Sequence, residues 1–159
     1  MPTADDEFSA AYAQYLPAVS AYLARRVERR HVEDLAADVF AVAWQKRGTV
    51  TRGEELPWLY RVAANLLANH RRREATGVAI VKLLRNTDSA PSAEDIVIAD
   101  QSLAAAWRQL KAKDREVLAL ATFEELAVGE IATALGVSAN AVSIRLHRSR
   151  KQLVELLKD

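Results

Sequence analysis

The stretch "GEIATALGVSANAVSIRLHRSR", residues 129–150, decides the fold of the C-terminal half. Ala132 stands four residues before Gly136, and Val142 stands six residues after it. Where two short helices cross closely, the first needs a small side chain and the tight turn needs a residue that tolerates positive φ. The spacing therefore predicts a helix-turn-helix, with Ser138 capping the second helix through its hydroxyl. We expect three apolar residues to pack around the crossing: Ile131, Leu135 and Val137.

The second helix of this motif has two chemically different sides at 100° per residue. We expect four residues to face the domain's own core: Val142, Leu146, Ser149 and Leu153. The other side is polar and basic, with residue types that meet phosphates, purine edges or a thymine methyl. The candidate DNA-contacting residues are Asn140, Ser143, Ile144, Arg145, His147 and Arg148. Arg145 lies between the two sides, so both packing and a phosphate contact remain open for it.

The composition limits what kind of protein this is. The chain has 159 residues, half of them hydrophobic, which suffices for one mid-sized domain or two small ones. It has no cysteine, which excludes disulfides, thiolate catalysis and sulfur-ligated zinc. No apolar run approaches the roughly 18–20 residues of a membrane span, and the acidic start "MPTADDEF" does not resemble a signal peptide. We therefore expect a cytoplasmic protein.

The first half of the chain has apolar residues at helical spacing, and strand patterns are nearly absent. One helix is expected from Phe8 to Leu23, with a kink or break at Pro17. A second is expected to end before Gly48, and Pro57 suits the first turn of a third. The pattern predicts a small helical bundle.

The predicted fold class is all-α, with two small helical domains joined by a flexible linker. The boundaries are 1–76 for the first domain, 77–100 for the linker and 101–159 for the second. The linker contains "NTDSAPSAED", residues 86–95, which is rich in small, polar and turn-forming residues. The short "VAIVKLL", residues 78–84, is ambiguous between strand and helix.

The motifs of both halves resemble a known family. The elements Arg115–Leu118, Glu130–Ala132 and Val142–Arg150 are similar to "REREVL", "EIA" and "V-x-x-R-L-x-R-A-R" in region 4 of extracytoplasmic-function (ECF) sigma factors. "VEDLAADVFAVAWQK", residues 32–46, and "PWLYRVAANLLANHRRRE", residues 57–74, resemble the polymerase-docking and minus-10 helices of region 2. Two matches in the family's order are more specific than either one.

The resemblance implies roles for individual residues. Those implied to contact core RNA polymerase are Asp34, Ala37, Asp38 and Ala41. Those implied to contact opened minus-10 DNA are Thr51 and Arg52 in a base-holding loop, and Asn65, Asn69, Arg71 and Arg72 on the following helix. A base can be read on its pairing edge only after it leaves the stack, so such a loop is needed. The second domain would then read minus-35 DNA as a duplex.

The implied function is that of a sigma factor, which directs core RNA polymerase to promoters and is controlled by an anti-sigma factor. No catalytic residues and no cofactor are expected. No metal site is expected either, because His31, His70 and His147 lie far apart in sequence without a recognisable ligand spacing. Arg71 and Arg72 also have a simpler explanation, since a basic helix C-terminus is favoured by the helix dipole alone.

The chain departs from the family's pattern at several positions. Alanine stands at 37 where the family often has glutamine, and threonine stands at 51 in place of an aromatic residue. Glu125 occupies a place where glycine is common. Residues 140–142 read N-A-V where G-T-V is common, which suggests a different minus-35 preference.

Four other interpretations compete with this one. The first is an ordinary surface helix, because any such helix can show a polar face to solvent. An ordinary surface helix does not, however, need a small residue four positions before a glycine and an aliphatic residue six positions after it, as at Ala132, Gly136 and Val142. A response-regulator transcription factor shares the C-terminal pattern but needs alternating strands and helices in its first half. An enzyme is disfavoured because the five glycines form no phosphate-cradling loop. A helical sigma antagonist would inhibit polymerase rather than program it.

Overall fold

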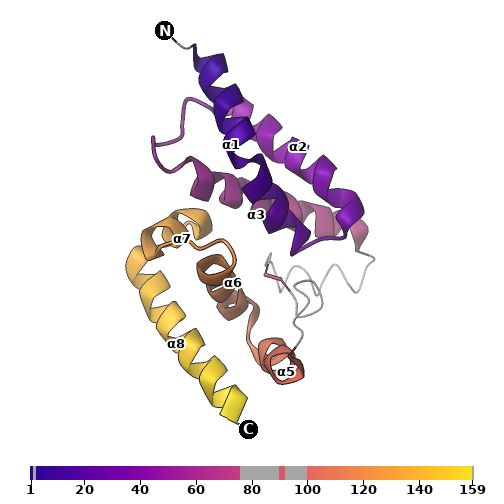
Figure 1. Cartoon of the computed structure of the whole chain (residues 1–159), viewed down its shortest axis with the longest axis vertical. Helices are drawn as coiled ribbons and strands as arrows, with labels where there is room; N and C mark the ends of the chain where they lie inside the picture. Colours follow the sequence, from indigo (N-terminus) through magenta and orange to yellow (C-terminus); the bar gives the residue numbers. More distant parts are fainter. Residues whose placement is uncertain (2, 76–89, 92–99, 159) are drawn as a thin grey trace.

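The computed structural model describes residues 1, 3–75, 90–91 and 100–158. Within these ranges every regular element is an α-helix (Figure 1). The N-terminal helices are α1 (Ala4–Ala24), α2 (Arg29–Gln45) and α3 (Glu55–Glu74). The C-terminal helices are α5 (Gln101–Gln109), α6 (Ala112–Thr122), α7 (Val128–Leu135) and α8 (Ala139–Lys158). The prediction of an all-α chain is confirmed, and most of the predicted linker, including residues 78–84, lies outside the described residues.

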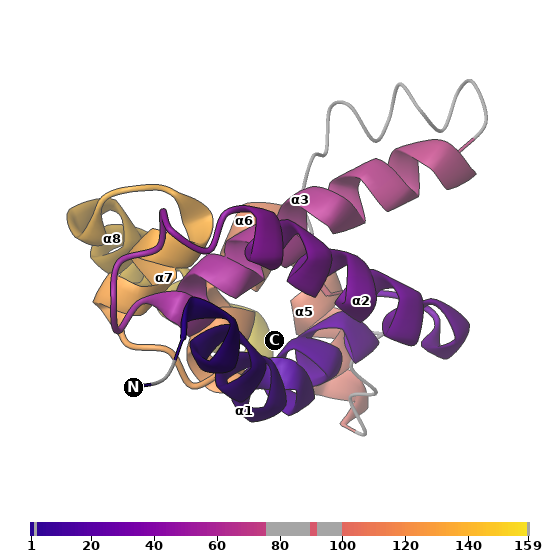
Figure 2. The same cartoon turned by 90° about the horizontal axis from the view of Figure 1, so that it is seen from above.

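The three N-terminal helices form a bundle in which α1, α2 and α3 contact one another (Figure 2). Its core includes Val19, Leu23, Val39 and Leu67, all fully buried. The sequence predicts a kink or a break at Pro17, and the break is wrong, because α1 continues through this residue. Pro17 lies on the exposed side of the helix, where water can satisfy the carbonyl that loses its backbone partner.

The C-terminal helices form a second unit, in which α8 packs on α5, α6 and α7. The buried hydroxyl of Ser149 donates to Asp114 Oδ1 at 3.0 Å and so joins α8 to α6. Trp107 Nε1 donates to the carbonyl of Pro91 at 3.0 Å. Glu125, between α6 and α7, has a φ of 56°, a conformation that costs a non-glycine residue energy. This explains why glycine suits that position.

The two units pack against each other, mainly through α3 and α7. Thr133 Oγ1 on α7 lies 3.5 Å from Glu54 Oε1, next to the start of α3. Gly136 lies so close to α3 that a Cβ atom added to it would be 3.0 Å from the guanidinium carbon of Arg61. Side chains buried in both units belong to one core cluster, so the helices of the two domains form one packed body in this structure.

Candidate nucleic-acid interface

The turn between α7 and α8 has the predicted geometry. Gly136 adopts the left-handed conformation with φ 69° and ends α7. Its N–H donates to the carbonyl of Ala132 at 2.8 Å, and the N–H of Val137 donates to the same carbonyl at 3.1 Å. The hydroxyl of Ser138 accepts from the N–H of Ala141 at 3.1 Å and caps α8. The predictions for Gly136 and Ser138 are confirmed.

The two sides of α8 are also as predicted. Val142, Leu146 and Ser149 are buried, and Leu153 is half-buried. The residues predicted to contact minus-35 DNA are exposed, except for half-buried Arg145: Asn140, Ser143, Ile144, His147 and Arg148. The solvent-exposed side of α8 is therefore mostly polar, with Ile144 as an apolar member.

The crossing of α7 and α8 differs from expectation at one residue. Ile131 is fully buried and Leu135 half-buried, but Val137 is 49% exposed. The prediction that Val137 packs at the crossing is wrong, because about half of its surface stays in solvent. Val137 is therefore an exposed apolar side chain just before α8.

The residues predicted to contact minus-10 DNA lie on α3 and on the loop before it. Thr51 and Arg52 are exposed in this loop, as are Asn65 and Asn69 on α3. Arg72 Nη1 lies 3.3 Å from Asn69 Oδ1 and donates to it, so these two side chains are placed together. Arg71 is half-buried and donates through Nη2 to the carbonyl of Arg26 at 3.0 Å. It therefore has a structural partner within the bundle in addition to any role with DNA.

The residues predicted to contact polymerase share one exposed face of α2. This face carries Asp34, Ala37, Asp38 and Ala41, which follow one another at the three- and four-residue steps of a helix face. The opposite face is buried and carries Leu35, Ala36, Val39, Phe40 and Ala43. The predicted docking face is therefore acidic with small side chains, and the buried residues behind it hold α2 against the bundle.

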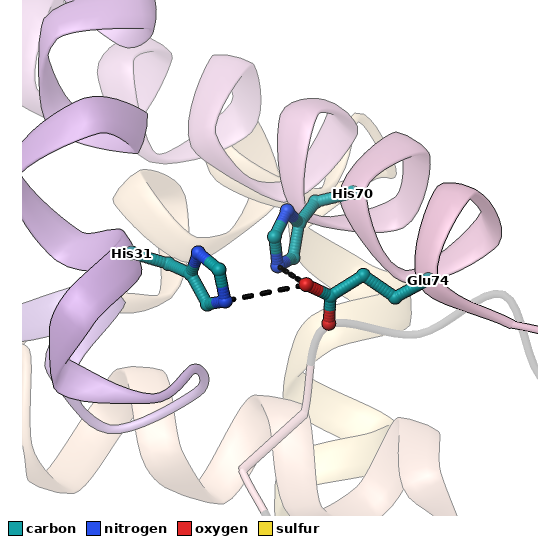
Figure 3. A group of neighbouring side chains, drawn as sticks. All are labelled: His31, His70 and Glu74. Atoms are coloured by element: carbon teal, nitrogen blue, oxygen red, sulfur yellow. Dashed lines mark ion pairs between the residues drawn. The ribbon is translucent and has the colours of Figure 1, made fainter.

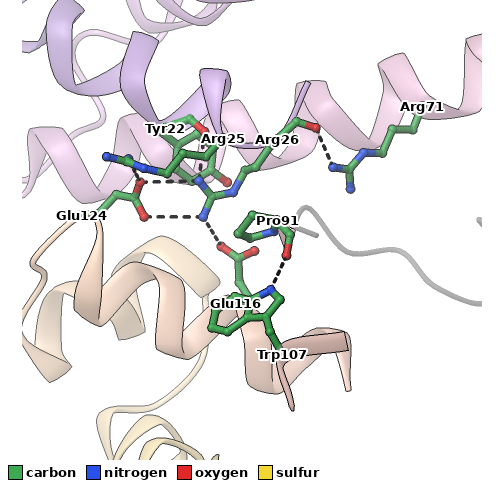
Figure 4. A network of polar contacts seen from close by, with 8 residues as sticks. All are labelled: Tyr22, Arg25, Arg26, Arg71, Pro91, Trp107, Glu116 and Glu124. Carbon is green, nitrogen blue, oxygen red and sulfur yellow. Dashed lines mark hydrogen bonds and ion pairs between the residues drawn. The ribbon is translucent and has the colours of Figure 1, made fainter. Parts of the chain in front are cut away.

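A buried ion-pair network at the junction of the two units is invisible in the sequence (Figure 4). The side chain of Arg26 is fully buried; its Nη2 lies 3.4 Å from Glu116 Oε1, and its Nη1 lies 3.5 Å from Glu124 Oε1. Arg25 Nη1 contacts the same Glu124 oxygen at 2.6 Å. The guanidinium of Arg26 also stacks on the Tyr22 ring, 3.7 Å from its centroid.

Arg26 stays charged although it is buried. Burial alone would lower the pKa of Arg26, but Tyr22 and the carboxylates of Glu116 and Glu124 outweigh it and raise the pKa. Burial, helped by the charge of Glu124, raises the pKa of Tyr60 to about 12, so this phenol is neutral. The end of α1 is therefore joined to α6 and to the residues after it by a permanent, desolvated cation.

A second cluster that sequence reasoning missed brings together His31 on α2 with His70 and Glu74 on α3 (Figure 3). The two imidazole rings lie 4.5 Å apart between centroids. The only sequence signal is the four-residue step from His70 to Glu74, which places both on one helix face. His31 is distant in sequence and joins them only because α2 packs on α3.

Among the described residues, none of the helices has the length and apolar character needed to cross a membrane.

Comparison with protein families gives two matches along the chain. Residues 11–76 match Sigma-70 region 2, and residues 100–153 match Sigma-70, region 4. The order and placement agree with the two helical units.

Two RNA polymerase sigma factors are similar in sequence to this chain over most of their own length. The chain is 30% identical to RNA polymerase sigma factor CarQ of Myxococcus xanthus, over 97% of this chain and 91% of that protein. It is also 30% identical to RNA polymerase sigma factor YlaC of Bacillus subtilis, over 93% of this chain and 90% of that protein.

Solved structures share the fold over almost the whole chain. CnrH, solved in complex with the cytosolic domain of CnrY, matches with a TM-score of 0.63 and 25% identity, over 95% of this chain and 87% of that one. RpoE of Bartonella quintana, solved with the anti-sigma factor NepR, matches with a TM-score of 0.64 and 22% identity, over 96% and 97%. The chain belongs to the sigma-70 family of RNA polymerase sigma factors, in its extracytoplasmic-function group.

Proposed function

We propose that this chain binds core RNA polymerase through α2, reads minus-35 DNA as a duplex through α8, and holds opened minus-10 DNA with α3 and the loop before it. The observation that carries the proposal is the exposed polar side of α8 behind the Gly136 turn. Such a helix fits the major groove, where each base pair presents its own pattern of donors and acceptors. Because polymerase and chromosome share the cytoplasm, we expect the chain to act there.

The chain contributes binding energy rather than catalysis. Bond formation belongs to polymerase, and we assign no catalytic residue to this subunit. The exposed Asn65 and Asn69, with Arg72 beside Asn69, offer amide and guanidinium groups to unstacked bases and to the phosphates next to them. Holding an opened strand in this way favours the melted state of the promoter.

Transcription in vitro tests the proposal directly. Core polymerase is supplied with and without this protein on a library of genomic fragments, and new start sites are mapped. We expect new start sites only with the protein, together with an isolable complex with core. A lack of both would exclude the function.

Replacing Arg148 by alanine is expected to weaken promoter binding by about 1–3 kcal/mol if the guanidinium reads a base. If the guanidinium contacts a phosphate instead, the slope of log K for binding against log salt concentration should become smaller in magnitude by about one. Binding of the core complex to promoter DNA is measured across a series of salt concentrations.

Lys158→Ala is the matched control for Arg148→Ala. Lys158 is an exposed cation on the same helix, about 15 Å further along its axis. It should leave promoter binding unchanged. Equal effects of the two substitutions would contradict a specific role for Arg148.

Replacing Asp38 by arginine is expected to weaken core polymerase binding at least about tenfold, because it reverses the charge of an exposed carboxylate on the proposed docking face. Affinity is measured by titrating core with labelled protein. The matched control is Glu155→Arg, which makes the same charge change on an exposed position of α8. An unchanged core affinity for Asp38→Arg would show that the docking face lies elsewhere.

We further propose that the packed arrangement is a resting state. Elements about 35 and 10 base pairs upstream of the start are about 25 base pairs apart, or about 85 Å of duplex. Here α3 packs on α7, and α7 packs on α8. Packed helices lie about 8–10 Å apart, and α3 and α8 are each about 30 Å long. In this arrangement α3 and α8 are therefore much closer together than about 85 Å.

An antagonist is the other expected partner. The RpoE structure that shares this fold contains an anti-sigma factor. We propose that a protein of this kind binds the present chain and covers its docking and reading faces until a signal releases it.

A further inference from the structure

We propose that His31, His70 and Glu74 form a binding site for a divalent transition-metal ion, with zinc as the metal that fits best. Both histidine Nε2 atoms approach the same carboxylate oxygen, Glu74 Oε1, at 3.2 Å from His31 and 3.5 Å from His70. One ligand atom from each residue lies within 4.8 Å of the others. Figure 3 shows the three side chains converging from two helices.

The separations match those of ligands around a tetrahedral ion. Zinc binds imidazole nitrogen at about 2.0–2.1 Å and carboxylate oxygen at about 2.0–2.2 Å. Ligand atoms on neighbouring corners of such a tetrahedron are then about 3.4 Å apart. The distances of 3.2 and 3.5 Å bracket this value. The separation of the two histidine ligand atoms is no more than 4.8 Å, and side-chain rotation that brings them to about 3.4 Å would place all three atoms around one ion.

The donor set belongs to zinc chemistry. Two imidazoles and one carboxylate bind zinc with a fourth position left to water, and imidazole also suits nickel, copper and iron. The Nε2 atom of His31 is buried and forms no hydrogen bond with any residue that the structure describes. A coordinate bond would satisfy this nitrogen better than a poorly aligned contact with Glu74.

The surroundings permit a cation despite the arginines close by in sequence. Arg71 donates to the carbonyl of Arg26, Arg72 donates to Asn69, and Arg30 pairs with Glu28 at 2.8 Å. These guanidinium groups are therefore directed to other partners. The His70 side chain is 15% exposed and Glu74 is 52% exposed, so an ion can reach the site from solvent.

The helices explain why the three residues meet. His70 and Glu74 are one turn apart on α3, and His31 lies in the first turn of α2. A bound ion would therefore join the start of the proposed docking helix to the end of the proposed minus-10 helix. Metal binding to the folded chain would stabilise this corner of the bundle.

The test uses the full-length protein with any histidine tag removed, because a tag binds the same metals. Zinc binding is measured by isothermal titration calorimetry, and cobalt is titrated as a spectroscopic probe whose visible absorption reports tetrahedral coordination. We expect one ion per chain and a rise in Tm on adding zinc. His70→Ala and Glu74→Gln should each weaken binding about 100-fold, since even outer-shell substitutions cost 10–100-fold.

His147→Ala is the matched control, because the chain has three histidines and His147 is exposed on α8. It should bind the ion like the unaltered protein. If a histidine variant unfolds, Glu74→Gln still tests the proposed ligand set. Glu74 lies on the surface and glutamine has nearly the same size, so this variant should keep the fold. Absence of saturable binding, or binding that His70→Ala and Glu74→Gln leave unchanged, would overturn the proposal. Neither measurement uses transcription, so the result is independent of the proposed promoter function.

Discussion

Replacing Arg26 by methionine is expected to lower the free energy of unfolding by about 3–5 kcal/mol, the cost of removing one partner of a buried ion pair. The guanidinium lies between Glu116 and Glu124, whose side chains are 7% and 1% exposed. Methionine fills much of the same volume but removes the cation that the two carboxylates share, and Glu124 then keeps only its contact with the partly exposed Arg25. The measurement is urea denaturation followed by circular dichroism, with the transition midpoint compared at equal m-value.

Arg25→Met is the control for Arg26→Met, because it removes a neighbouring arginine that contacts the same Glu124 oxygen. Arg25 is 29% exposed, and Glu124 keeps Arg26 as a partner after this substitution. Partial exposure screens the pair, so we expect a loss of no more than about 1 kcal/mol. If the midpoints of both variants shifted equally, the contribution of Arg26 to the free energy of unfolding would not come from its burial.

The helical faces could be predicted from the sequence because they depend on local periodicity. The crossing of α7 and α8 and the turn between them follow from steric requirements at Ala132, Gly136 and Val142, which all lie within one motif. The structure confirms both the crossing and the turn. The same holds for the acidic face of α2, since Leu35 and Val39 fix which side is buried and so which side carries Asp38. Residue type and spacing carry this information without any tertiary contact.

The missed features all depend on tertiary packing. Arg26 and Glu116 are 90 residues apart, and a fully buried arginine contradicts the ordinary preference for exposure. The cluster of His31 with His70 requires the register of α2 against α3, which periodicity does not provide. The continuation of α1 through Pro17 depends on the proline facing solvent. Local propensity cannot supply these pairings because the energy that fixes them arises only after the helices pack.

Covalently closing the junction between the two units is expected to reduce promoter-directed transcription at least tenfold. The chain has no cysteine, so Glu54→Cys and Thr133→Cys would introduce the only two thiols. Their native side chains approach to 3.5 Å, which lets a short bismaleimide bridge them in the packed arrangement. A chain held in this state could not place α3 and α8 on elements about 85 Å apart.

The linker between the maleimides should contain a disulfide, so that reduction restores the open chain and provides an internal control. Transcription is compared before cross-linking, after it and after reduction, with Glu54→Cys alone treated in parallel. Loss after cross-linking and recovery after reduction would support a resting state that opens on the promoter. Full transcription from the cross-linked chain would instead mean that α3 and α8 do not read the two elements at the same time, and the assignment of one of them would have to be abandoned.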